Sequence, residues 1–237
     1  MLEIKNVSKS YDGKKLACNE VNLVIDNGDI YGFIGHNGAG KTTLLKAIAG
    51  VINFDSGEII INGISVKDNP IEVKKQIAYI PDNPDVYENL SGIDYLNFMA
   101  DVFEISTDIR IEKINDYAKM FGMTEVLGQP ISSYSHGMKQ KIVIIGALIH
   151  KPKILLLDEP FVGLDPQASY LLKEEFKSLC AKGTSIFFST HVLEVVEKLC
   201  NKVAIIKNGR ILESGKTEDI ISSQSLESVF MEIASEA

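Results

Sequence analysis

The chain has 237 residues, 45% of them hydrophobic, and a formal net charge of −8 at pH 7. This length is enough for one compact domain with a substantial core. The excess of 32 acidic over 24 basic side chains argues against nucleic acid as a partner, because a surface that binds phosphate backbones needs clustered Lys and Arg. The longest apolar run, Ile142–Ile149, is far shorter than the roughly 20 residues of a membrane-spanning helix. We therefore expect any membrane role to depend on a partner protein.

The three cysteines, Cys18, Cys180 and Cys200, lie far apart in the sequence and form no CxxC pair. Isolated cysteines in apolar or helical surroundings are typical of buried, reduced thiols in a cytosolic protein. The N-terminus shows no basic region followed by an apolar stretch, which is the pattern of a signal peptide. These features predict a cytoplasmic location.

Hydrophobic periodicity predicts strands and helices along the N-terminal half of the chain. Residues 2–25 alternate apolar and polar positions, which predicts short antiparallel strands. Residues 30–34 read as a buried strand, and a glycine-rich turn then leads into a helix over 41–49. Further strands are predicted at 57–63 and 76–80, followed by a mainly helical insert at 93–123.

In the C-terminal half, helices and strands alternate. The predicted order is a helix over 137–150, a strand over 154–157, a helix over 166–182, a strand over 185–189, a helix over 192–199 and a strand over 203–206. This alternation predicts an α/β fold with a parallel sheet that is covered on both faces. Leu226, Val229, Phe230 and Ile233 then follow at helical spacing, which predicts a last helix packed on its own domain.

A glycine-rich segment between the predicted strand and helix fits the phosphate-loop pattern GxxxxGK[ST] in full. Its residues are Gly35, His36, Asn37, Gly38, Ala39, Gly40, Lys41 and Thr42. Backbone N–H groups of such a loop, together with the helix N-terminus, form a nest for phosphate oxygens. We expect Lys41 to contact the β- and γ-phosphates, Thr42 to ligate Mg²⁺, and Thr43 to give another phosphate hydrogen bond.

Asp158 and Glu159 directly follow the apolar strand 154–157. A parallel sheet presents the carboxyl ends of its strands at the edge where ligands bind. We expect Asp158 to hold Mg²⁺ and Glu159 to orient or deprotonate the attacking water. Two acids that merely end a strand are the alternative, and the complete phosphate loop disfavours it.

Three further segments narrow the class of nucleotide-binding protein. They are Ser133–Lys141, Gly163–Pro166 and Ser189–His191. With the phosphate loop and the acidic strand end, their order resembles that of the ABC ATPase family from Leu2 to about Glu213.

The resemblance implies a fold as well as a function. The fold is that of a P-loop NTPase (RecA-like) with a parallel-sheet core, an antiparallel β subdomain and an α-helical subdomain. It implies one ABC ATPase domain over 1–237. Its expected parts are the core with the β lobe at about 1–82 and 151–215, the helical subdomain at about 83–150, and a C-terminal helical tail at 216–237.

The resemblance also assigns roles to individual residues. Ser135 and Gly137 would cap the γ-phosphate of ATP bound to the opposite subunit, although the usual LSGGQ is here Tyr134–Met138. Asp165 would cross the dimer seam, and His191 would contact the γ-phosphate. Each has a plainer alternative: Ser135 and Asp165 are also typical helix caps, and a lone histidine is commonly a surface or core residue.

The resemblance gives expectations for two other positions. Tyr11 matches the aromatic residue that stacks on adenine, with an exposed residue at a strand end as the alternative. Asp82 stands where most relatives have a glutamine, and we expect it to ligate Mg²⁺, with a turn residue as the alternative.

The implied function is that of an ATP-hydrolysing subunit, with ATP and Mg²⁺ as cofactors, that drives an integral-membrane permease on a separate chain. The expected assembly is a dimer with a second copy or a related ATPase, peripheral on the inner face of the cell membrane. The signature YSHGM and Asp82 resemble the corresponding residues of small bacterial exporter subunits. That resemblance implies a groove for a permease helix, bordered in this chain by Pro84, Val86, Tyr87 and Leu90. Core packing of these four residues remains the alternative, and an ABC-type ATPase that acts on DNA or the ribosome is the alternative function.

Overall fold

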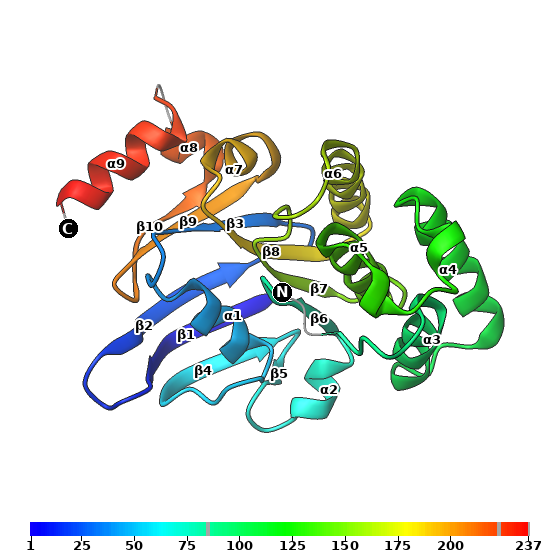
Figure 1. Cartoon of the computed structure of the whole chain (residues 1–237). Coiled ribbons are helices and arrows are strands. Elements are labelled where there is room, and N and C mark those ends of the chain that lie inside the picture. The colour runs from blue at the N-terminus through cyan, green and yellow to red at the C-terminus, as the bar shows by residue number, and fades with distance from the viewer. Residues whose placement is uncertain (84–85, 222–223, 237) are drawn as a thin grey trace. The chain divides into compact units, whose positions relative to one another are not determined.

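The computed structural model describes residues 1–83, 86–221 and 224–236 (Figure 1). These residues form two compact units. The first comprises Met1–Tyr79, Lys153–Pro160 and the chain from Phe176 onward, and the second comprises Ile80–Pro152 and Phe161–Glu175. No helix among these described ranges has the length and hydrophobicity needed to cross a membrane.

The strands are β1 Leu2–Ser10, β2 Leu16–Ile25, β3 Ile30–Ile34, β4 Ser56–Ile61, β5 Ile64–Ser65, β6 Ile77–Ile80, β7 Ile154–Asp158, β8 Ser185–Thr190, β9 Lys202–Lys207 and β10 Arg210–Lys216. The α-helices are α1 Lys41–Ile48, α2 Pro70–Lys74, α3 Gly92–Val102, α4 Thr107–Met120, α5 His136–Leu148, α6 Pro166–Ala181, α7 Leu193–Leu199, α8 Thr217–Ile221 and α9 Leu226–Glu236. Two short 3₁₀ helices lie at Thr124–Val126 and Ile131–Ser133.

A six-stranded sheet in the order β10-β9-β3-β8-β7-β6 forms the centre of the first unit. Strands β9, β3, β8 and β7 run parallel, and β10 is antiparallel to β9. Every residue of β3, β7 and β8 is buried, as expected for inner strands of a parallel sheet that is covered on both faces. Because β3, β8 and β7 are parallel neighbours, the loops that follow these strands emerge at one edge of the sheet.

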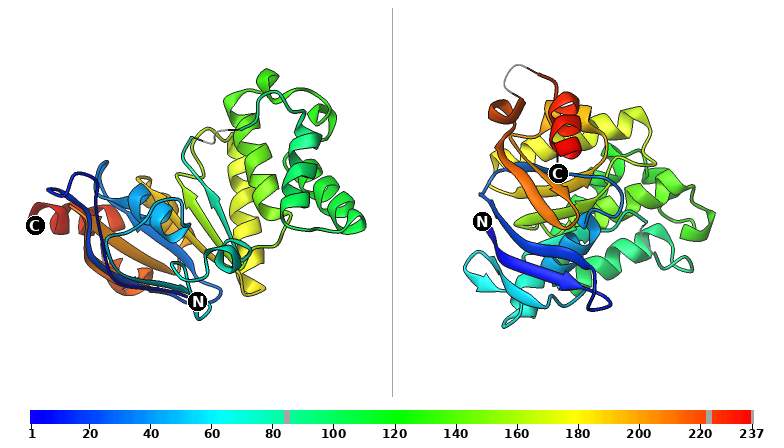
Figure 2. Two further views of the ribbon diagram at one scale, coloured as in Figure 1. Left: turned by 90° about the horizontal axis from the view of Figure 1, so that it is seen from below. Right: turned by 90° about the vertical axis from the view of Figure 1, so that its left-hand side faces the viewer.

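A second, antiparallel sheet in the order β2-β1-β4-β5 belongs to the same unit. Its inward-facing residues, such as Ile4 and Ile59, share one core with Leu44 and Leu45 of α1 and with Phe33 of the larger sheet. Figure 2 shows these strands in blue and cyan. Both the parallel core and the antiparallel β subdomain predicted from the sequence are confirmed.

The second unit is largely helical. Helices α3, α4 and α5 pack on one another around buried side chains that include Leu96, Ala100 and Ile142 (Figure 1). The Ser91 hydroxyl caps α3 by accepting a hydrogen bond from the Asp94 N–H. This helical body is the predicted α-helical subdomain.

The native cysteines are free thiols in the first unit. Cys18 and Cys200 are buried and Cys180 is half-buried, so the predicted buried thiols are confirmed for the first two. Burial raises the pKa of Cys18 and of Cys180 to about 12, and it also raises the pKa of Cys200.

Candidate functional site

The loop between β3 and α1 has a backbone that only glycine permits at one position. Gly40 has φ of +114°, and a Cβ built on it would lie 2.1 Å from the Ala17 carbonyl oxygen. Gly38 also has a positive φ, and no neighbour would obstruct its Cβ within 4 Å. Gly40 is the N-cap of α1 and offers no side-chain acceptor, and the first turn of α1 contains no acidic residue. The N-terminal N–H groups of this helix can therefore serve an anion.

Lys41 holds its charge inside this loop. Its side chain is buried, and Nζ donates to the carbonyl oxygens of Gly35 at 2.6 Å and His36 at 3.3 Å. Burial lowers the pKa of Lys41, while the negative charges of Glu159 and Asp158 oppose that shift. An ammonium in this position can exchange loop carbonyls for phosphate oxygens, and the contact of Lys41 with the β- and γ-phosphates remains a prediction.

Asp158 at the end of β7 is joined to the phosphate-loop helix. Thr42 Oγ1 donates to Asp158 Oδ2 at 2.5 Å, and Ser189 Oγ on β8 donates to Asp158 Oδ1. The predicted Mg²⁺ ligands Thr42 and Asp158 thus lie side by side, at the carboxyl edge of the sheet. The Thr42 hydroxyl and the Asp158 carboxylate, together with phosphate oxygens, would give Mg²⁺ the oxygen ligands that it prefers.

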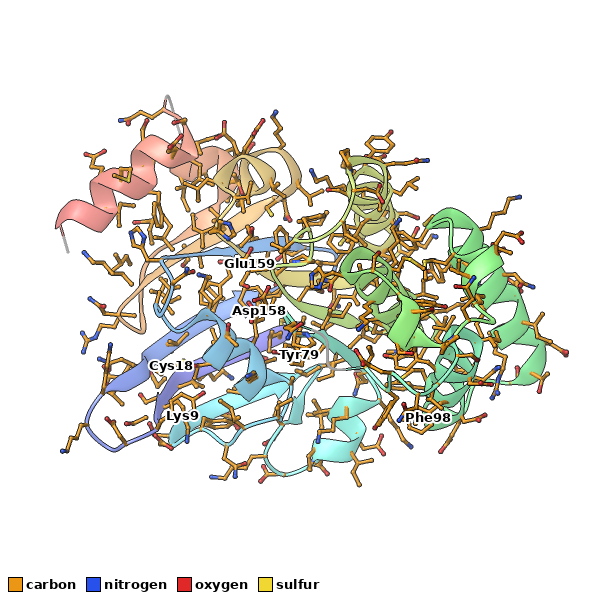
Figure 3. The ribbon with its side chains drawn as sticks, viewed as in Figure 1. Lys9, Cys18, Tyr79, Phe98, Asp158 and Glu159 are labelled. Carbon is orange, nitrogen blue, oxygen red and sulfur yellow. The ribbon has the colours of Figure 1, made fainter. Side chains whose placement is uncertain are left out.

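Glu159 and His191 form a second pair at the same edge (Figure 3 labels Asp158 and Glu159). His191 Nδ1 lies 2.9 Å from Glu159 Oε1. The His191 side chain is 61% exposed, whereas that of Glu159 is 12% exposed. Glu159 Oε2 is buried and has no hydrogen-bond partner among the described residues. A carboxylate with one oxygen bonded and the other without a described partner has the chemistry of a general base, and this role of Glu159 remains a prediction.

Tyr11 directly follows β1 and lies beside the phosphate-loop helix α1. Its side chain is 67% exposed, and its hydroxyl is 3.3 Å from Thr43 Oγ1. Lys9 Nζ lies 5.8 Å from the ring centroid. An open aromatic face next to the phosphate site suits a stacked nucleobase.

In the second unit, the predicted signature residues stand at the start of α5. Ser135 is the N-cap of this helix, where its hydroxyl accepts the Met138 N–H at 3.3 Å. The cap that was an alternative reading is therefore present, and it leaves Ser135 exposed. Capping uses one lone pair of the Ser135 hydroxyl, so its O–H can still donate a hydrogen bond to a phosphate oxygen.

The segment Gly163–Asp165 packs against this helix N-terminus. A Cβ on Gly163 would lie 2.5 Å from the His136 ring, and one on Gly137 would lie 2.7 Å from the Gly163 carbonyl oxygen. Lys141 Nζ pairs with Asp165 Oδ2 at 2.7 Å, and this hydrogen bond is the main cause that lowers the pKa of Asp165. Asp165 Oδ1 also accepts the Ala168 N–H, which caps α6.

Asp82 belongs to the second unit and is exposed, and its role as a Mg²⁺ ligand remains a prediction. Among the residues expected to border a permease groove, Pro84 lies outside the described residues. Val86 is buried, whereas Tyr87 is 61% exposed. Leu90 is half-buried.

Two contacts of the site went unrecognised in the sequence. Ser189 holds Asp158, and Lys141 holds Asp165. Ser189 directly precedes Thr190 and His191 at the end of a predicted strand, so its place in the site could have been foreseen. The Lys141–Asp165 pair spans 24 residues and gives no local signal.

The phosphate loop and the acidic strand end fall within residues 18–162, which match the ABC transporter family model. A solved structure of the ATP-binding subunit of an ABC transporter is 34% identical, with a TM-score of 0.95, and each chain covers 99% of the other.

Curated relatives agree with this match. An uncharacterized ABC transporter ATP-binding protein of Nostoc sp. is 36% identical over 85% of this chain, which spans 60% of the relative's length. The ABC transporter ATP-binding protein NatA of Bacillus subtilis is 32% identical over 94% of this chain and 93% of its own. The Nod factor export ATP-binding protein I of Cupriavidus pinatubonensis is 31% identical over 94% of this chain and 69% of its own. The chain therefore belongs to the ABC transporter family, as one of its ATP-binding ATPases.

Proposed function

We propose that this chain hydrolyses ATP as one half of a dimer and thereby drives a membrane permease carried on a separate polypeptide. The observation that carries the proposal is the Glu159 carboxylate, with one oxygen bonded to His191 and the other buried without a described partner beside Asp158. The phosphate loop and this carboxylate stand at one edge of one sheet, as an attack by water on a bound phosphate requires.

The chemistry follows from these positions. Lys41, the loop N–H groups and the start of α1 bind the phosphates, and Tyr11 receives the base. Glu159 Oε2 takes a proton from water as the water oxygen bonds to the γ-phosphorus. The bond from the γ-phosphorus to the bridging oxygen breaks, and that oxygen leaves with ADP. His191 holds the carboxylate in place during this step.

The residues present fit a bound Mg²⁺. Thr42 Oγ1 and Asp158 would hold it. Mg²⁺ neutralises negative charge on the β- and γ-phosphates when it is bound.

We infer a dimer from the position of the signature residues. Ser135 is exposed at the N-terminus of α5, where the helix dipole favours an anion. Ser135 and Gly137 of one chain would close the nucleotide held by Lys41 and Thr42 of the other, and Asp165 would lie at the seam. Loss of the γ-phosphate would then remove the group that both chains bind.

The proposed function is tested by phosphate release from ATP by the purified chain, alone and with a candidate multi-span permease sought among the products of the neighbouring genes. We expect hydrolysis by the chain and a change in rate when the membrane protein is present. Absence of hydrolysis in both samples would contradict the ATPase proposal. An unchanged rate, with no co-purification, would contradict the permease proposal alone. Export is the direction that the Nod factor relative suggests.

The permease contact predicts an effect of one exposed aromatic residue. Tyr87 packs edge-on against Phe98 with ring centroids 5.7 Å apart, and Phe98 is 43% exposed. We expect Tyr87→Asp to lower co-purification with the permease at least tenfold, because a charge would replace an apolar anchor. ATP hydrolysis by the isolated chain should not change.

Tyr170→Asp is the matched control, since Tyr170 is exposed to 62% and lies on α6. Equal losses in the two variants would mean that Tyr87 is not part of the permease contact.

A further inference from the structure

The phosphate loop is supported by the C-terminal part of the chain. The turn between β9 and β10 places Gly209, with φ of +79°, against the loop. Its N–H donates to the Ala39 carbonyl oxygen at 2.8 Å, and its own carbonyl oxygen accepts the Asn19 N–H at 2.9 Å. One backbone hydrogen bond thus ties the second half of the loop to this turn, and the turn is itself bonded to Asn19 on β2.

The first half of the loop has a different support. His36, Asn37 and Gly38 are exposed. The imidazole ring of His36, however, meets the ring of Phe230 on α9, with centroids 5.0 Å apart and an angle of 56° between the planes. A side chain 194 positions further along the sequence (230 minus 36) therefore touches the most open part of the phosphate site.

Helix α9 holds the Phe230 ring in a defined place. Leu226 at its start is fully buried, and its N–H donates to Glu197 Oε2 at 3.2 Å. Phe230 follows one turn later and is 8% exposed. Met231, the next residue, is 61% exposed and points away from the core. The helix is therefore docked through the face that carries Leu226 and Phe230, close to α7 and α8 (Figure 1).

We propose that Phe230 is a positioning residue for the nucleotide. By packing on His36 it restricts the exposed half of the phosphate loop to one conformation, so that less conformational entropy is lost when phosphates bind. This inference rests on the proposed nucleotide-binding role of the loop. Phe230 does not touch the reacting atoms, so its removal should raise KM for ATP and leave kcat unchanged.

The test is a fluorescence titration of parent and variants with mant-ATP, together with steady-state hydrolysis. For Phe230→Ala we expect nucleotide affinity to fall about three- to tenfold, the range that corresponds to the loss of one aromatic contact. Phe230→Tyr, which keeps the ring, should restore affinity, and Met231→Ala should bind like the parent. Phe230→Leu replaces Phe230→Ala if the alanine variant does not fold.

A double-mutant cycle with His36→Ala identifies the route of the effect. If Phe230 acts through His36, its replacement should cost no further affinity in the His36→Ala background. The inference would be overturned if Phe230→Ala had the nucleotide affinity and the KM of the parent. It would also be overturned if adding Phe230→Ala to His36→Ala lowered affinity as much as it does in the parent. Failure of the parent itself to bind mant-ATP would instead overturn the proposed function.

Discussion

Replacing Glu159 with Gln is expected to abolish ATP hydrolysis while ATP binding persists. The amide cannot accept the proton of the attacking water, and loss of a general base typically costs about 10²–10⁴ in rate. Glu159 itself has a φ of +51°, in the left-handed region. Gln has the same shape, so it adds no backbone strain beyond what Glu159 already bears. Phosphate release and mant-ATP titration measure the two properties separately.

The same variant tests the dimer. Because Glu159→Gln does not cleave the γ-phosphate, a dimer of this variant should accumulate in the presence of ATP. Light scattering detects such a dimer. Glu58→Gln is the control, since it removes an exposed carboxylate on β4. Hydrolysis by Glu159→Gln at the parent rate would show that another group acts as the base. Full loss of hydrolysis without an ATP-dependent dimer would contradict the shared site and leave the base in place.

Replacing Lys41 with Ala is expected to remove nucleotide binding itself. A hydrogen bond to a charged group contributes about 1.5–3 kcal/mol, and Lys41 can give two, to the β- and γ-phosphates. The expected loss of affinity is therefore roughly a hundredfold or more. Calorimetric titration with ATP measures it.

Lys46→Ala provides the comparison, because Lys46 lies in the same helix α1 but in its last turn. We expect parent-like affinity for this variant. If Lys41→Ala bound ATP as tightly as Lys46→Ala does, the loop would not be a phosphate site.

Much of the fold follows from local patterns in the sequence. Strands β3, β7 and β8 are buried and largely apolar at their centres, and their predicted bounds agree with the structure to within one residue. The helical insert is a different case, because its periodic pattern gives no sign of the break at 103–106 that separates α3 from α4. Short elements such as α2 were not predicted, since five residues carry too little periodicity.

The candidate site divides in the same way. The phosphate loop is one continuous segment of the sequence, and Asp158 and Glu159 are adjacent residues. The sheet topology then places the loop and the acidic pair at one edge. The bond from Glu159 to His191 spans 32 residues, and the ring contact of His36 with Phe230 spans almost the whole chain. Such pairings depend on packing between elements, for which a single sequence offers no periodic signal. The family resemblance supplied His191. The helical spacing predicted that Phe230 packs on its own domain, but it did not predict the contact with His36.

The native cysteines have a practical consequence for labelling experiments. Maleimides react with the thiolate, and a pKa of about 12 leaves Cys18 and Cys180 with roughly a thousandfold less thiolate at neutral pH than an ordinary exposed cysteine. A cysteine introduced at exposed Tyr170 would therefore take up dye ahead of them. A second one at exposed Val24 would label the first unit. Dyes can therefore be attached at these two positions without first removing the natural thiols.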